Sequence, residues 1–185
     1  MTKFLKHLIK ITEDYSIRSK IVYCEENGFL CCHVEPKDQI VSIKPYGCWY
    51  SWGPVWLQFL CRDKKWGIKR AETYASAHKL QINYSKILKL RKFKDFVDFT
   101  KKYGIACNKI KKYYGISPKA FEDKDYESYE YPYVIDWKKV AKKYNGIDIM
   151  LHWTACDKFY WYNGWDISGG CIWNFKSIEK VQKIR

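Results

Sequence analysis

The segment at residues 44–56, K-P-Y-G-C-W-Y-S-W-G-P-V-W, constrains the fold of this chain more than any other. It combines three tryptophans and two tyrosines with two glycines and two prolines. Aromatic residues fit a pleated, half-buried surface, so residues 48–51 are predicted to form a strand. The glycines and prolines on both sides mark where the strand begins and ends. Such a strand can form the wall of a pocket for a planar ligand, or it can belong to the core.

The length and composition predict one folded domain over residues 1–185. Hydrophobic residues make up 47% of the chain and aromatic residues 18%, which is well above what a disordered chain carries. No run of about 18 apolar residues occurs, so neither a membrane span nor a membrane partner is expected. Residues 1–7 lack the apolar centre of a signal peptide, so a cytoplasmic location is expected.

The net charge of +14 favours an anionic partner, which could be a nucleic acid, a phosphorylated cofactor or an acidic surface. Most of the basic residues are lysines, and this bias also fits an AT-rich coding genome. The eight cysteines are irregularly spaced and are expected to be reduced. Cys31, Cys32 and His33 are a weak lead to a metal site, and without a C-x-x-C or H-x-x-x-H pair no metal is expected.

Short apolar runs predict most of the secondary structure. Residues 4–12, which include His7, alternate apolar and polar side chains and are predicted to be a first strand, with a short helix as the alternative. Further strands are predicted at residues 21–24, 29–34, 80–84, 87–90, 147–151 and 169–174. Helices are predicted at residues 55–61, 92–103 and 136–144, the last of them capped by Asp136. The pattern predicts an α+β fold with a mixed or antiparallel sheet and two or three short helices.

Sequence motifs of the common hydrolases and phosphate-binding loops are missing. The chain contains no G-x-S-x-G, no H-E-x-x-H and no G-x-x-x-x-G-K. A cysteine–histidine nucleophile is conceivable from the number of cysteines, but no spacing locates it.

Three ordered segments carry a resemblance to a known family. They are K-P-Y-G-C-W-Y-S at residues 44–51, I-D-W-K-K-V-A-K-K-Y-N-G-I-D-I at residues 135–149, and G-W-D-I-S-G-G-C-I-W-N at residues 164–174. Together they resemble motifs of uncharacterised phage and large DNA virus proteins. Those proteins in turn look like distant members of the ADP-ribosyltransferase fold. The resemblance implies two small sheets around a cleft that holds NAD as the substrate.

The resemblance also implies roles for individual residues. His7 is similar to the first-strand histidine that holds the ribose or nicotinamide side of NAD. Tyr50 and Ser51 match the nicotinamide pocket, where Trp49 binds the cofactor or packs in the core. The family's glutamate is expected near the two glycines at residues 169–170, so Asp166 or Asp148 is the candidate catalytic carboxylate.

Such a site would break the bond between ribose and nicotinamide. A nearby carboxylate stabilises the oxocarbenium-like charge that develops on the ribose. ADP-ribose would then pass to a nucleic acid or protein acceptor. Two alternatives remain open: a basic nucleic-acid-binding module without catalysis, in which aromatics between lysines stack on bases, and a host-interaction protein that keeps the fold and lacks the activity.

Overall fold

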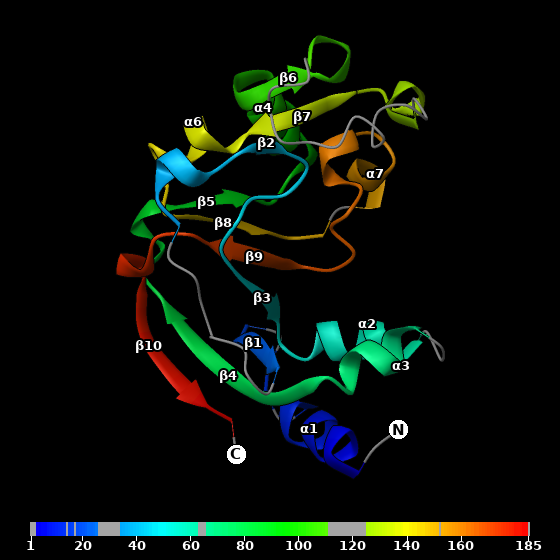
Figure 1. Cartoon of the computed structure of the whole chain (residues 1–185), viewed down its shortest axis with the longest axis vertical. Helices are drawn as coiled ribbons and strands as arrows, with labels where there is room; N and C mark the ends of the chain where they lie inside the picture. The colour runs from blue at the N-terminus through cyan, green and yellow to red at the C-terminus, as the bar shows by residue number, and fades with distance from the viewer. Residues whose placement is uncertain are drawn as a thin grey trace.

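The fold is α+β, with one large curled sheet and one small sheet (Figure 1). The computed structural model describes residues 3–13, 15–16, 18–25, 34–62, 66–110, 125–151 and 153–184. The predictions for residues 29–33, including the Cys31-Cys32-His33 lead, lie outside these ranges. The prediction of an α+β class with a mixed sheet is therefore confirmed, although the two sheets are unequal in size.

The large sheet has seven strands in the order β10-β4-β1-β3-β9-β8-β5, and all neighbours are antiparallel except β5 and β8. Its strands are β1 (Lys20–Glu25), β3 (Cys48–Trp52), β4 (Tyr74–Ile82), β5 (Ile87–Leu90), β8 (Gly146–Ile149), β9 (Gly169–Ile172) and β10 (Ile178–Lys183). The small sheet is antiparallel and consists of β2 (Val41–Ser42), β7 (Tyr133–Asp136) and β6 (Gly104–Ala106). Two small sheets were expected, whereas most strands join one continuous sheet.

Six α-helices are described, so the expectation of two or three was wrong. They are α1 (Lys3–Glu13), α2 (Val55–Arg62), α3 (Trp66–Ala71), α4 (Phe93–Tyr103), α6 (Trp137–Ala141) and α7 (Trp153–Cys156). The three predicted helices correspond to α2, α4 and α6. Asp136 caps α6 as predicted, because its side chain accepts a hydrogen bond from the Lys139 amide. The helices α3 and α7 are too short to give a periodic pattern in the sequence.

The predicted first strand at residues 4–12 is a helix, so the alternative interpretation of this segment is the correct one. Leu5, Leu8 and Thr12 are the buried residues on α1. Their spacing of three and four residues places them on one side of a helix, whereas a strand would need every second residue buried. The alternation in the sequence arose from lysines that lie on the solvent side of the same helix.

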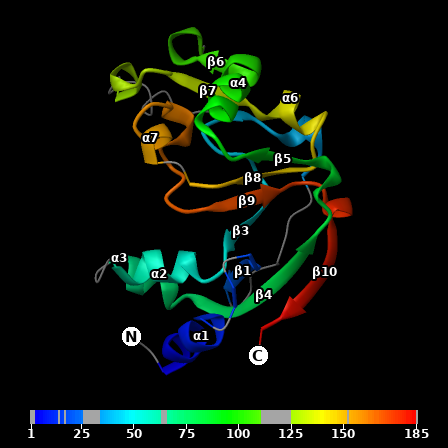
Figure 2. The ribbon, with the colours of Figure 1, turned by 180° about the vertical axis from the view of Figure 1, so that it is seen from behind.

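The helices form two groups that cover the same face of the large sheet. Ile21 on β1 pairs with Ser51 on β3 and packs with α1, α2 and α3. Cys171 on β9 pairs with Trp49 on β3 and packs with α4, α6 and α7. Directly opposed residues of antiparallel strands share a face, so Trp49 and Ser51 lie between the two helical groups. Figures 1 and 2 show these groups toward opposite ends of the molecule.

None of the helices in the described part of the chain has the length and apolar character needed to cross a membrane. Among the cysteines that the structure describes, Cys61, Cys107 and Cys156 are free thiols.

Candidate functional site

A cavity of about 520 Å³ lies on the sheet face between the two helical groups. Strand β3 forms its floor through Trp49 and Ser51, and β1, β9, α2, α3 and the loop at residues 164–167 form its walls. Its size is within the range of about 300 to 1,000 Å³ that is usual for small-molecule sites. The central aromatic segment therefore lines a pocket as well as contributing to the core.

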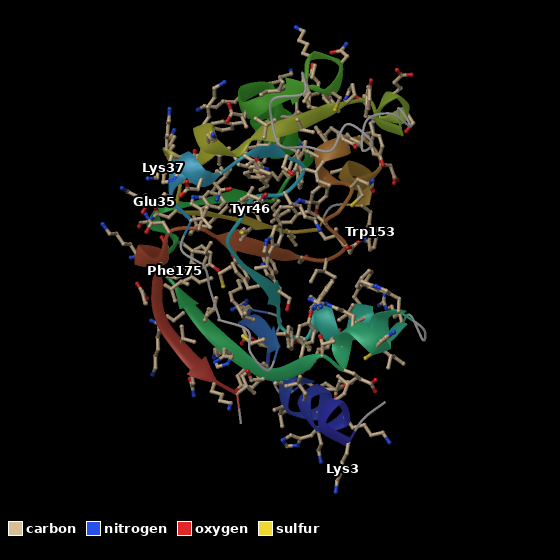
Figure 3. The ribbon with its side chains drawn as sticks, in the orientation of Figure 1. Lys3, Glu35, Lys37, Tyr46, Trp153 and Phe175 are labelled. Carbon is tan, nitrogen blue, oxygen red and sulfur yellow. The ribbon has the colours of Figure 1, made fainter. Side chains whose placement is uncertain are left out.

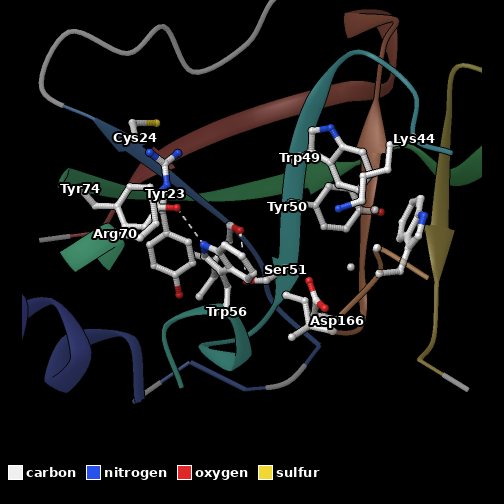
Figure 4. Close-up of a pocket in the computed structure, with 16 residues that line it drawn as sticks. Tyr23, Cys24, Lys44, Trp49, Tyr50, Ser51, Trp56, Arg70, Tyr74 and Asp166 are labelled. Atoms are coloured by element: carbon white, nitrogen blue, oxygen red, sulfur yellow. Dashed lines mark hydrogen bonds between the residues drawn. The ribbon is translucent and has the colours of Figure 1, made fainter. Parts of the chain in front are cut away.

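One end of the cavity is built from aromatic residues around Arg70 (Figure 4). The indole N–H of Trp56 donates to the Tyr74 hydroxyl at 2.9 Å. The Arg70 guanidinium lies 5.6 Å from the centre of the Tyr74 ring, and the Tyr23 ring lies 5.6 Å from the same centre. This end offers flat apolar surfaces beside a permanent positive charge.

The other end is built around Lys44 and Asp166 (Figure 4). The Trp49 and Trp165 rings meet with centres 4.7 Å apart, and the Lys44 amine lies 5.5 Å from the centre of the Trp49 ring. Burial lowers the pKa of Lys44, while the negative charge of Asp166 opposes this shift. This end therefore combines aromatic surface, an amine and the one carboxylate among the lining residues.

Gly164 makes room for the Lys44 side chain. A Cβ atom at this position would lie 2.8 Å from Lys44 Cε and 3.1 Å from its Nζ. Because Gly164 has no side chain, the space that a Cβ atom would take is open to the Lys44 amine.

Three buried polar atoms of lining residues have no hydrogen-bond partner. They are the hydroxyls of Tyr23 and Tyr50 and the indole N–H of Trp165. A buried donor without a partner costs about 1 to 3 kcal/mol. Among the described residues, the Tyr23 hydroxyl and the Trp165 indole N–H are therefore available to a ligand, whereas the Tyr50 hydroxyl lies on the other face of the sheet.

The predicted residues Trp49 and Asp166 line the cavity together, and the exposed Asp166 side chain reaches it from the loop before β9. Ser51 also lines the cavity, but its hydroxyl already donates to the Gly53 carbonyl at 3.0 Å. Tyr50 borders the cavity as well, although strand alternation turns its side chain to the opposite face of the sheet from Trp49. Burial, followed by the charge of Asp148, raises the pKa of Tyr50 well above its ordinary value.

Asp148 lies on that opposite face and is not among the residues that line the cavity. Its side chain is only 1% exposed and accepts hydrogen bonds from Trp52 Nε1 at 2.7 Å and Arg91 Nη2 at 2.6 Å. Arg91 also donates to the Asp148 carbonyl at 2.7 Å. These contacts link β8 to the ends of β3 and β5, so Asp148 has a structural role. Of the two predicted carboxylates, the cavity contains Asp166 alone.

The positions where the resemblance places a glutamate cannot carry a side chain. A Cβ atom at Gly169 would lie 2.5 Å from the Tyr50 carbonyl oxygen, and one at Gly170 would lie 2.3 Å from the Ile147 carbonyl oxygen. Both obstacles are backbone atoms of neighbouring strands, which cannot move aside. The carboxylate among the lining residues is that of Asp166, in the loop before β9.

His7 is exposed on α1 and is not among the lining residues, so its predicted place on the first strand of a cleft is wrong.

Sequence reasoning missed Arg70, Tyr74, Trp56 and Lys44 as site residues. Trp56 and Lys44 lie in the aromatic segment that drew attention, so a search of its flanks could have found them. Arg70 and Tyr74 carry no motif.

Neither a metal centre nor a cysteine nucleophile emerges from the described residues. They contain no group of three or more His, Cys, Asp or Glu side chains arranged to hold a metal ion. Burial raises the pKa of the Cys61 thiol, that of Cys107 to about 12 and that of Cys156 to about 11. These thiols stay protonated at neutral pH, and a protonated thiol is a poor nucleophile.

Comparison of the chain with protein-family models, with curated proteins and with solved structures gives no match in any of the three. The site must therefore be interpreted from its own geometry.

Proposed function

We propose that the protein binds NAD in this cavity and transfers ADP-ribose from it to a nucleic acid or protein acceptor, as a divergent ADP-ribosyltransferase. The observation that carries the proposal is the division of the cavity into two aromatic ends, each with its own cation. The sequence resemblance supports the same assignment independently.

A dinucleotide matches this division. NAD has two planar heterocycles joined through two riboses and a pyrophosphate. The Trp56 and Tyr74 end would hold the adenine, and the Trp49 and Trp165 end would hold the nicotinamide. Aromatic rings stack on such heterocycles, and the cations Arg70 and Lys44 offset the pyrophosphate charge.

Asp166 supplies the group that the chemistry requires. When the bond between the ribose C1′ and the nicotinamide nitrogen breaks, the electron pair leaves with nicotinamide and positive charge develops on the ribose. A carboxylate beside the ribose stabilises that charge. The acceptor nucleophile then bonds to C1′ and gives up its proton.

The test combines NAD binding with transfer of label from NAD to a cell lysate. Asp166→Asn is expected to retain most of the NAD affinity and to lose about 100-fold or more of the transfer rate, as when one charge-stabilising group is removed. Trp49→Ala is expected to weaken NAD binding in calorimetry. Asp98→Asn, on the exposed side of α4, is the matched control and should change neither quantity. Failure of the wild-type protein to bind NAD at millimolar concentration would overturn the proposal.

A purely electrostatic nucleic-acid-binding function receives less support. It predicts one stripe of basic residues, but exposed lysines occur on α1 and on α6, at opposite ends of the molecule (Figure 1). The positive charge is therefore spread over the surface, and the cavity is the more specific feature.

A further inference from the structure

Large apolar side chains are exposed on both sides of the cavity. Trp153 on α7 is 72% exposed, Met150 just before it is 45% exposed, and Trp66 on α3 is 58% exposed. Folded proteins expose single apolar residues often, but exposed tryptophans at the rim of a cavity mark an interaction site.

Both tryptophans belong to segments that border the cavity. Trp66 lies one helical turn before Arg70, so the two residues share one side of α3, and Arg70 lines the cavity. On the other side, the Leu151 amide donates to the Ser168 hydroxyl at 2.9 Å, next to the lining residue Ile167. Figures 1 and 2 both show α7 and α3 on the same side of the molecule, and Figure 3 labels Trp153 there.

Three cations and one carboxylate, that of Glu72, are exposed on the described residues around Trp66. Lys69 and Arg70 are exposed on α3, and Arg62 is exposed at the end of α2. Tryptophan beside several cations is the combination that binds single-stranded nucleic acid, in which bases stack on the rings and phosphates meet the cations. A duplex does not offer the faces of its bases, since they are already stacked.

We propose that Trp66, Trp153 and the cations of α3 bind single-stranded nucleic acid at the mouth of the cavity and present it as the acceptor. This inference rests on the proposed function, because it names the acceptor of that transfer. Trp66 would hold the strand beside the Arg70 end of the cavity, and Trp153 would hold it beside the loop that carries Asp166, so that the strand passes over the mouth.

The test measures binding of a labelled oligonucleotide of about 12 nucleotides, DNA or RNA, by fluorescence anisotropy without NAD. Trp66→Ala and Trp153→Ala are each expected to weaken binding about five- to 150-fold, the value of one base stacked on an aromatic ring. Lys69→Met should reduce the slope of log affinity against log salt by about 0.7. Lys138→Met, an exposed lysine on α6, is the matched control and should leave affinity near the wild-type value.

The outcomes separate this inference from the proposed function. Unchanged affinity in both tryptophan variants would overturn the inference, as would a wild-type protein that binds no oligonucleotide but labels a protein of the lysate. If oligonucleotide binding depends on both tryptophans but the protein does not bind NAD, the nucleic-acid-binding surface is supported and only the proposed function is overturned. Since neither tryptophan lines the cavity, both variants should bind NAD like the wild type.

Discussion

Replacing Asp148 by alanine tests whether this carboxylate is structural. The change leaves the Trp52 indole N–H and the Arg91 guanidinium without the acceptor that each now uses. Removing one partner of a buried ion pair costs about 3 to 5 kcal/mol. Arg91 is 30% exposed and keeps its bond to the carbonyl of residue 148, so the loss should lie near the lower limit, at about 3 kcal/mol.

Arg91→Ala should cost more than Asp148→Ala, at about 4 to 5 kcal/mol. Arg91→Ala leaves the Asp148 carboxylate, which is 1% exposed, with the Trp52 indole as its hydrogen-bond donor. A buried charge that has lost its ion-pair partner costs more than a partly exposed one. The exposed pair Lys94–Asp98 on α4 is the matched control, and Lys94→Ala should cost less than about 1 kcal/mol.

Urea unfolding followed by tryptophan fluorescence measures these differences, provided that the slope of the unfolding free energy against urea concentration is the same in all variants. Near-wild-type stability of Asp148→Ala would refute the structural reasoning. If that variant were stable but had lost NAD-dependent transfer, the catalytic role predicted for Asp148 from the sequence would be restored.

Three further predictions concern the site and its support. Gly164→Ala should displace the flexible Lys44 side chain, so NAD affinity should fall in calorimetry while the unfolding free energy changes by less than about 1 kcal/mol. Gly170→Ala should destabilise the protein by about 3 kcal/mol in urea unfolding, because its Cβ would meet the Ile147 carbonyl; an unchanged midpoint would contradict this. Burial lowers the pKa of Lys20 from 10.5 to about 8, so the folded state loses this proton first, and the residue's contribution to stability rises between pH 8 and pH 10.5. The free energy of unfolding of the wild type minus that of Lys20→Met should therefore rise between pH 8 and pH 10.5 and stay constant below pH 8.

The sequence predicted local features well. Strand β3 was predicted because aromatic residues bounded by glycine and proline have few other conformations available. The α6 helix followed from Asp136 as its cap and from apolar residues at helical spacing. In both cases the deciding information lies within about ten residues of chain, which is the range over which propensity and periodicity act.

Long-range relations were not predictable in the same way. The sequence favoured Asp166 over Asp148 because Asp166 precedes the turn at residues 168–170. The place of Asp148, on the face of the sheet opposite the cavity, follows only from the pairing of β8 with β9. Arg91, whose ion pair fixes the place of Asp148, is one of several basic residues at positions 89–94, and no motif distinguishes it from the others. The α1 helix was predicted as a strand because surface lysines imitate an alternating pattern.

The pairing of β3 with β9 has a consequence for folding. Cys48 lies opposite Ile172, so the floor of the cavity joins segments from distant parts of the chain. Contacts of this kind form late, because closing a long loop costs entropy before the contact repays it. The lining residues extend from Ile21 to Gly170, so no short fragment contains the floor and both ends of the cavity. The proposed NAD binding should therefore appear only with the final folding phase, and a fluorescent NAD analogue would then report complete folding rather than the formation of separate helices.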